Sequence, residues 1–288
     1  MTAVVAMRLP LSEDLAGFVG LLQRLNVPFR VSEESGEQVL WVPNEELAEQ
    51  VRSLYQRYPQ GDPELTAPAW KPQRGPGFLE QLRLSKMTAA VLLVTFVVAA
   101  VTLLGANPTT LRWFTFQDFQ LVGSDHVMFI PLADGLAAGQ WWRLLTPMLL
   151  HFGWLHLAMN AMWYWELGRR IEYRQGGLML LGLSLGVGLV SNVVQYMVSG
   201  PSLFGGLSGV LYGLLGHCWI FQLLAPTPAY RLPKGVVGMM LIWLLVCLSG
   251  VIDLLGFGSI ANGAHVGGLV VGCATGALGG LLARRKGM

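Results

Sequence analysis

The sequence predicts an all-α polytopic membrane protein with six transmembrane helices, preceded by a small α+β domain. Three observations support this fold class. Charged residues make up only 12% of the 288 residues, whereas a soluble domain carries about 25%. Hydrophobic residues make up 53% of the chain and gather in long runs without Asp, Glu, Lys or Arg. This small number of charges cannot cover a water-exposed surface. We therefore expect lipid to surround most of the chain.

The composition also excludes several classes of function. A net charge of +2 without a basic patch argues against a nucleic-acid partner. Three cysteines, Cys218, Cys247 and Cys273, lie in apolar runs without disulfide or metal spacing, so we expect inert packing residues. The motif His-Glu-x-x-His is absent, and we expect neither a metal nor a cofactor. Glu13 and Asp14 interrupt the first apolar segment, which does not resemble a signal peptide.

Residues 1–58 are expected to form the small α+β domain, on the cytoplasmic side. Alternating hydrophobicity indicates strands, and cap residues before apolar periodicity indicate helices. The expected elements are a strand at Val4–Leu9, a helix from Ser12 to about Leu25, strands at Pro28–Ser32 and Gln38–Val42, and a helix at Glu45–Tyr58 capped by Asn44. No residue in this domain suggests catalysis.

Residues 59–86 are expected to be a linker. The segment is rich in proline and glycine, and such composition favours a semi-extended chain without its own core.

Residues 87–283 are expected to be the membrane domain. Its first uncharged run is 25 residues long, and about 20 residues suffice to cross the hydrocarbon layer. A later run is too long for one helix and is divided by a segment rich in Ser, Gly and Pro at 199–206. The six expected spans are Met87–Leu111, Leu144–Trp165, two within Gln175–Tyr230, Gly235–Ile252 and Leu254–Ala283.

The distribution of Lys and Arg predicts the orientation of these spans. Basic residues precede the first span, follow the second and the fourth, and form the tail at 284–288. The loops after the third and fifth spans have none. Because short cytoplasmic loops are rich in Lys and Arg, both termini are expected in the cytoplasm. The long external loop at 106–146 carries Arg112 and Arg143, which the rule allows in long loops.

A serine at the head of the fourth span is the first candidate for chemistry, since a polar group within a span is costly and needs a reason. Ser208 lies in Gly206-Leu207-Ser208-Gly209, directly after the break. It should therefore occupy the first turn of a helix, whose backbone N–H groups lack intrahelical partners and favour an anion. A hydroxyl nucleophile beside such donors is what acyl transfer requires.

A histidine at the start of the sixth span is the candidate base. His265 and Ser208 begin helices that enter from the same side, so the two should lie at a similar depth. Small residues would bring the helices into close contact and the imidazole within reach of the Ser208 oxygen. Tyr212, one turn below Ser208, is expected to pack on the His265 ring. The small residues are Gly268, Gly272, Gly276 and Gly280 in the sixth span and Gly209 and Gly213 in the fourth.

The second span supplies candidate donors. His156 and Asn160 are four positions apart and therefore share one helix face. They are expected to complete an oxyanion hole with the backbone N–H of Ser208. For His151, five positions earlier, a structural and a functional role both stay open.

Neither nearby acid fits as a third catalytic member. Asp253 is twelve residues before His265, and Glu166 lies at the cytoplasmic end of the second span. We therefore expect a Ser–His dyad whose histidine is oriented by packing. Glu166 is expected to tether the cytoplasmic end through the arginines that follow it. His217, nine positions beyond Ser208, is expected to be a core histidine on the opposite face.

The motifs together resemble the rhomboid family. They are the serine motif Gly206-Leu207-Ser208-Gly209, the last-span motif Ala264-His265-x-x-Gly268-x-x-x-Gly272, the second-span motif His151-x4-His156-x3-Asn160, and the Trp142-Arg143 pair of the first external loop. The combination is highly specific. The resemblance covers essentially the whole chain, although the first 70 residues match only in organisation.

This resemblance implies a rhomboid fold and an intramembrane serine endopeptidase of the bacterial inner membrane. Such an enzyme cleaves transmembrane protein substrates near the outer leaflet through an acyl-enzyme and has membrane lipids around it. Formation of a homo-oligomer stays open. Gly206, Gly209, Tyr212 and His151 would support the site. The loop at 106–146 would lie half submerged as a hairpin anchored by Trp142 and Arg143. Substrate would enter past the fifth span and the following loop, which includes Phe257.

Two alternatives from other classes remain. An inactive rhomboid-like scaffold that binds transmembrane clients would usually lack the serine or the histidine, and both are present. A small transporter with a histidine proton relay would usually show an internal repeat, and the sequence has neither a repeat nor a carboxylate in the middle of a span.

Overall fold

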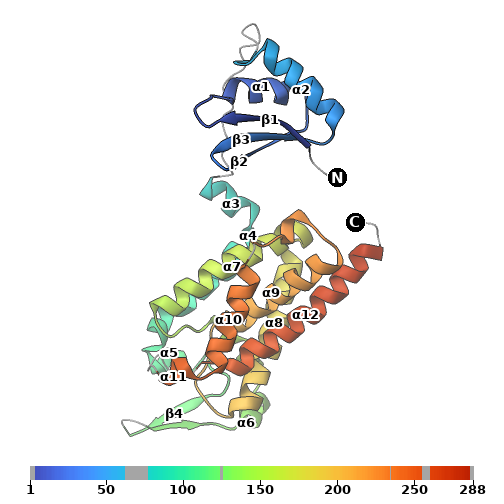
Figure 1. Cartoon of the computed structure of the whole chain (residues 1–288). Coiled ribbons are helices and arrows are strands. Elements are labelled where there is room, and N and C mark those ends of the chain that lie inside the picture. The colour runs from blue at the N-terminus through green and yellow to red at the C-terminus, as the bar shows by residue number, and fades with distance from the viewer. Residues whose placement is uncertain (1–3, 62–76, 124–125, 234, 255–259, 286–288) are drawn as a thin grey trace. The chain divides into compact units, whose positions relative to one another are not determined.

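The computed structural model describes residues 4–61, 77–123, 126–233, 235–254 and 260–285 (Figure 1). The chain forms two compact units that divide between Gly77 and Phe78. Of the expected linker, residues 62–76 lie outside the described residues, as do Phe257 and the tail residues 286–288. The end of the linker is a helix, α3 (Phe78–Leu84). Extended chain was the wrong prediction there, because these seven residues are mostly good helix formers without Pro or Gly.

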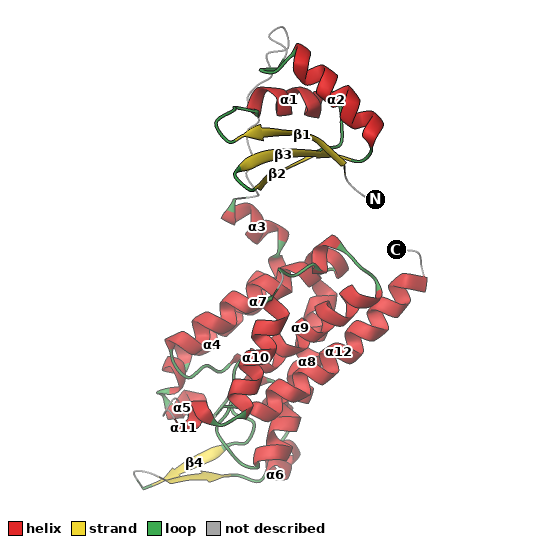
Figure 2. Ribbon diagram, in the orientation of Figure 1, coloured by secondary structure: helices red, strands yellow, loops and turns green. Residues whose placement is uncertain are grey.

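The first unit is a three-stranded antiparallel sheet with two helices (Figure 2). The strand order is β1-β3-β2, so the central strand β3 pairs with both neighbours. Phe18, Leu22 and Leu40 are completely buried in its core. The elements are β1 (Val4–Pro10), α1 (Ala16–Arg24), β2 (Arg30–Glu34), β3 (Glu37–Val42) and α2 (Glu45–Arg57).

The two helices of this unit begin differently from one another. Asn44 caps α2 as predicted, since its side chain accepts a hydrogen bond from the N–H of Leu47 at 2.9 Å. The predicted start of α1 after Ser12 is wrong. That helix begins at Ala16, whose N–H donates to the carboxylate of Asp14 at 2.9 Å.

The second unit is mostly helical. In the described part of the chain, two helices are long and apolar enough to cross a membrane, α8 (Gly177–Ser199) and α12 (Asn262–Arg285). Three shorter apolar helices accompany them, α4 (Lys86–Val101), α9 (Ser208–Leu224) and α10 (Val236–Leu248). A further long helix, α7 (Trp154–Gln175), carries several charges in its second half. The number of membrane crossings stays a prediction.

The second expected span begins later than the sequence indicated. Residues before α7 form two short 3-10 helices, η2 (Trp141–Leu144) and η3 (Thr146–Leu149), with Pro147 in the second. Gly153, with φ of 105°, ends the turn that leads into α7. His151 therefore precedes the helix and was wrongly placed within it.

The first expected span is also shorter than predicted. The helix α4 ends at Val101, and the chain turns through η1 (Leu103–Gly105) into the short helix α5 (Pro108–Leu111). At its other end, the N–H groups of Met87 and Thr88 each donate to the carboxylate of Glu172 on α7 at 2.8 Å. This contact caps α4 with a side chain from another helix.

The helix α9 lies at the centre of this unit (Figure 1). It contacts α7, α8 and α12, and 11 of its 17 residues are buried. In contrast, the backbone of α10 comes close mainly to α12 and the short helix α11 (Val251–Leu254). One side of α10 buries Met240 and Leu244 in the core of this unit, and the helix also exposes large apolar side chains such as Ile242 and Leu245. Exposed apolar side chains also cover α4 and α12, as expected of helices that face lipid.

The connection between α5 and α7 contains a β-hairpin, β4 (Phe119–Val122) paired with β5 (His126–Phe129), and the helix α6 (Leu132–Ala137) (Figure 2). Leu121 and Met128 on the hairpin are more than half exposed, at 54% and 52%. An apolar exposed hairpin next to a lipid-facing bundle is costly in water.

Candidate active site

A tight turn brings the chain into α9. Gly206 has φ of 123°, a conformation that glycine adopts readily and other residues rarely. Its N–H donates to the carbonyl of Pro147 at 3.0 Å, which joins the turn to the segment before α7. A Cβ at Gly205 would lie 2.6 Å from the Cβ of Leu150. Two glycines are therefore required for this turn, and Ser208 becomes the first residue of α9.

Ser208 and His265 lie within hydrogen-bond distance of each other. The Oγ of Ser208 is 2.8 Å from the Nε2 of His265, across the interface between α9 and α12. His265 is only 5% exposed. The two residues that the sequence selected from separate spans are thus brought together at the beginnings of their helices.

Glycines explain how the two helices come this close. A Cβ at Gly268 would lie 2.0 Å from the carbonyl oxygen of Gly209. A Cβ at Gly272 would likewise lie 2.0 Å from the carbonyl oxygen of Gly213. The helices therefore contact each other backbone to backbone, as small residues permit.

Packing orients the ring of His265. The ring of Tyr212 lies 4.9 Å away, centroid to centroid, at an interplanar angle of 45°. The Tyr212 hydroxyl donates to the carbonyl of Met240 on α10 at 3.1 Å. Among the described residues, the buried Nδ1 of His265 has no hydrogen-bond partner, so no described carboxylate orients the imidazole. The side chain of Asp253 lies outside the described residues.

His156 and Asn160 of α7 lie beside the turn that precedes Ser208. A Cβ at Gly206 would lie 2.8 Å from the Nε2 of His156 and 3.6 Å from the Nδ2 of Asn160. The Nδ1 of His156 accepts a weak hydrogen bond from the N–H of Phe152 at 3.4 Å. A neutral ring that accepts at Nδ1 carries its proton on Nε2, so the donor side of His156 faces the turn.

His151 packs against His156. It is fully buried, its Nδ1 donates to the carbonyl of Leu149 at 3.2 Å, and its ring centroid is 4.9 Å from that of His156. Within the described residues, the contacts of His151 are with Leu149 and His156, which favours a supporting role over direct contact with substrate.

Two buried polar residues of α8 hold backbone segments near the site and were missed from the sequence. The amide of Asn192 donates to the carbonyls of Leu144 and Leu145 at 3.0 and 3.3 Å. The Oε1 of Gln195 accepts a hydrogen bond from the N–H of Ala264 at 3.1 Å. The cost of polar side chains within an apolar helix was the signal that could have identified them.

Other polar residues lie away from this site. His217 is a core histidine whose ring forms hydrogen bonds with the side-chain oxygens of Gln175 at 2.9 Å and Thr275 at 3.1 Å. Glu166 pairs with Arg169 and Arg170. Arg170 also donates to the carbonyl of Ala229 at 3.0 Å, which ties α7 to the segment after α9. In the described part of the chain, no three His, Cys, Asp or Glu side chains gather as metal ligands.

Arg143 is the central side chain of the 106–146 loop. It is 2% exposed and donates to the Oε1 of Gln140 at 2.6 Å and to the carbonyls of Arg112 and Thr115. Asp118 lies 3.5 Å from it and also receives two hydrogen bonds from Arg112 at 2.9 and 2.8 Å. Burial alone would raise the pKa of Asp118, but these partners hold the pKa below its usual value, so the carboxylate is charged.

Trp142 links two parts of the same loop through contacts with Trp113. Its indole N–H donates to the carbonyl of Trp113 at 3.0 Å, and the two rings stack with centroids 6.5 Å apart. Trp142 and Trp113 are both exposed. Aromatic side chains with one polar atom are typical of the boundary between lipid and water.

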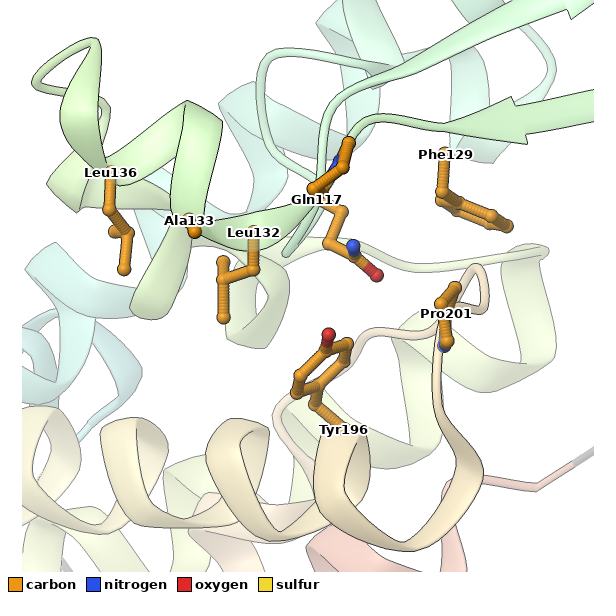
Figure 3. A pocket seen from close by; sticks show the side chains of 8 residues that line it. Gln117, Phe129, Leu132, Ala133, Leu136, Tyr196 and Pro201 are labelled. Atoms are coloured by element: carbon orange, nitrogen blue, oxygen red, sulfur yellow. The ribbon is translucent and has the colours of Figure 1, made fainter.

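A pocket of about 630 Å³ lies between this loop and the end of α8 (Figure 3). Its lining is mostly apolar, and the hydroxyl of Tyr196 faces Leu132 and Gln117 across it. Ser208 and His265 do not line this pocket, so it is separate from the site between α9 and α12. The lining residues are Gln117, Phe129, Pro131, Leu132, Ala133, Leu136, Tyr196 and Pro201.

Comparisons with known proteins cover both units. The Rhomboid N-terminal domain family matches residues 1–69, and the Rhomboid domain family matches residues 138–281, half of the chain. The chain is also similar to a solution structure of the N-terminal domain of a rhomboid intramembrane protease from P. aeruginosa. The identity is 72% over 24% of this chain and 99% of that chain, with a TM-score of 0.18.

Proposed function

The chain belongs to the rhomboid family of intramembrane serine proteases, and from this premise we propose that Ser208 and His265 are the catalytic dyad of an endopeptidase that cleaves transmembrane segments. The observation that carries the proposal is the 2.8 Å distance between the Oγ of Ser208 and the Nε2 of His265. A nucleophile and a base within hydrogen-bond reach are the minimum that acyl transfer requires.

The proposed reaction has two halves. Ser208 attacks the scissile carbonyl while the Nε2 of His265 takes the hydroxyl proton, and the same nitrogen then gives that proton to the leaving amine. An acyl-enzyme on Ser208 results. His265 then takes a proton from water as the water oxygen attacks the acyl carbonyl. The bond between the acyl carbon and the Oγ of Ser208 breaks, and Oγ takes that proton back from Nε2, which releases the second product and restores the dyad. This cycle requires a neutral His265 with its proton on Nδ1, and tight packing against Tyr212 holds that ring in place.

Three donors are proposed to hold the oxyanion. They are the N–H of Ser208, which is in the first turn of α9 and has no intrahelical partner, the Nε2–H of His156 and the amide of Asn160. The last two are supported by their positions beside Gly206, at 2.8 and 3.6 Å from where its Cβ would be. One proton of the Asn160 amide bonds the carbonyl of His156 at 3.0 Å, which leaves the other proton for the oxyanion.

Removing one of these donors is expected to lower kcat and to leave KM almost unchanged. The substitutions His156→Ala and Asn160→Ala should each reduce kcat by about 100-fold or more, because an oxyanion donor acts only in the transition state. Cleavage rates measured over a range of substrate concentrations would test this. His126→Ala, on the exposed hairpin, is the control and should retain full activity. A rise in KM at constant kcat would assign these side chains to substrate binding instead.

The proposed substrate is a transmembrane helix with small or helix-breaking residues near its outer end. Non-helical backbone is tolerated at membrane depth only where protein or water satisfies it, so the scissile segment would unwind into a hydrophilic cavity. Access past α10 is supported by the position of that helix, whose backbone comes close mainly to α11 and α12. The apolar exposed hairpin supports a half-submerged loop, with Trp142 and Arg143 as its anchor.

The proposed location is the bacterial inner membrane, with six crossings, cytoplasmic termini and the active site toward the outer leaflet. The distribution of Lys and Arg supports this orientation. Lipids would surround the helices, and self-association stays a prediction. No observation favours a scaffold or a transporter.

Covalent labelling tests the activity and the orientation together. A membrane-impermeant fluorophosphonate added to sealed right-side-out vesicles is expected to label Ser208 in the wild-type chain, because the site is proposed to open outward. Labelling should be lost in His265→Ala, since an unactivated serine reacts slowly. Mass spectrometry would identify the modified residue. If Ser208 is labelled only after detergent is added, the site opens to the cytoplasmic side and the proposed orientation is wrong. If Ser208 is not labelled in either condition, the proposed activity is contradicted.

A further inference from the structure

The first turn of α12 is capped by a side chain from another helix. The first N–H groups of a helix have no partners within it. Here the N–H of His265 donates to the carbonyl of Ala261 at 3.2 Å, which lies before the helix. The N–H of Ala264 instead donates to the Oε1 of Gln195 on α8 at 3.1 Å. Gln195 therefore contacts the backbone directly before the proposed base.

The contact between Gln195 and Ala264 requires a close approach of α8 to α12. Gln195 is 4% exposed, and its Nε2 donates to the hydroxyl of Ser199 at 2.8 Å. This bond leaves Oε1 as the acceptor that faces Ala264. A Cβ at Gly263 would lie 3.0 Å from both the Cα and the Oε1 of Gln195. A larger residue at Gly263 would displace the amide, so glycine makes the contact possible.

The position of this turn matters because little else orients His265. Its Nδ1 has no hydrogen-bond partner within the described residues, and the ring is held by Tyr212 and by its own backbone. Where the backbone of the first turn lies therefore determines where Nε2 lies relative to Ser208. A displacement of about 1 Å in a catalytic geometry can cost about 100-fold in rate.

We propose that Gln195 is a positioning residue for the dyad, which holds the first turn of α12 so that His265 stays within reach of Ser208. This inference rests on the proposed protease function and adds a residue from a third helix to the machinery. If Gln195 served the fold alone, its loss would lower thermal stability and leave the turnover of the folded enzyme unchanged.

Two substitutions at Gln195 test the inference in the full-length protein in detergent, well below its melting temperature. Gln195→Met keeps the length and removes the acceptor, and it is expected to lower kcat by about tenfold with KM nearly unchanged. The fluorophosphonate labelling rate of Ser208 should fall by a similar factor. Gln195→Glu keeps an acceptor for Ala264, and the Ser199 hydroxyl can donate to it, so this variant should retain most of the activity.

The matched control is Gln222 on α9, which makes the same kind of contact far from the dyad. Its Oε1 accepts the N–H of Thr227 in the following loop at 2.8 Å. Gln222→Met removes an equivalent cap, and it should leave kcat unchanged even where the melting temperature falls. Gly263→Ala is a second variant, which displaces the Gln195 amide without altering it and should also lower kcat.

Several outcomes would overturn the inference. They are full turnover in both Gln195→Met and Gly263→Ala, an equal loss of kcat in Gln222→Met, or a loss in Gln195→Glu as large as that in Gln195→Met. If Gln195→Met does not fold, the result for Gly263→Ala decides. A wild-type chain that neither cleaves a transmembrane substrate nor reacts with the probe would instead reject the protease function, and the positioning role with it.

Discussion

Replacing Ser208 with alanine is expected to abolish cleavage of a transmembrane reporter substrate by the purified protein, with a fall in kcat of about 10⁴-fold or more. The reason is chemical, since the Oγ that lies 2.8 Å from the Nε2 of His265 is the only atom removed, and no acyl-enzyme can form without it. Gel analysis of the two product fragments over several hours would measure the remaining rate.

The same variant should stay folded and should still bind substrate. Ser208 is half-buried, so loss of its hydroxyl should change the melting temperature by only a few degrees. Ser202→Ala is a matched control, because Ser202 lies in the preceding loop and its hydroxyl donates only locally, to the carbonyl of Gly200 at 3.2 Å. It should cleave at the wild-type rate.

Combining the dyad substitutions sharpens the test. His265→Ala should be nearly as inactive as Ser208→Ala, and the double variant should be no worse, because residues that act as one unit are not additive. Cleavage that persists in Ser208→Ala would mean that another nucleophile, or a contaminating protease, carries the activity.

Replacing Gly272 with alanine is expected to damage both stability and activity. A Cβ there would lie 2.0 Å from the carbonyl oxygen and 2.6 Å from the Cα of Gly213. These are backbone atoms of α9 and cannot rotate away, so α9 and α12 must separate by about 1 Å to reach ordinary contact. Overpacking of this kind costs about 1–3 kcal/mol or more, and the wider gap should lower kcat by about 100-fold.

An exposed glycine of α8 provides the control for this substitution. A Cβ at Gly186 would meet no described atom within 4 Å, and the residue is in the interior of a helix. Gly186→Ala should therefore be neutral or stabilise the protein by about 0.5–1 kcal/mol. Melting temperatures and cleavage rates of the two variants would be compared side by side. If the two variants have the same melting temperature and the same cleavage rate, the close contact between α9 and α12 is not required for stability or activity.

Much of the proposed site could be predicted because polar groups in apolar runs are rare and costly. Ser208 and His265 stood out for this reason, and the glycine repeat after His265 indicated a close helix contact. The starts of helices were less predictable. His151 was assigned to the second span because its run is uncharged, whereas Pro147 and Gly153 place a turn there.

The sequence by itself determined the membrane character of the chain, the order of its apolar segments and the candidate serine and histidine. Hydrophobicity and charge act locally along the chain, so they can be read from composition and spacing. Only the tertiary structure decided which groups meet, namely the dyad distance, the His156 donor beside Gly206 and the cap that Gln195 gives to Ala264. These contacts depend on the distances between helices, which are set by the close packing of α9 on α12 and of α8 on α12.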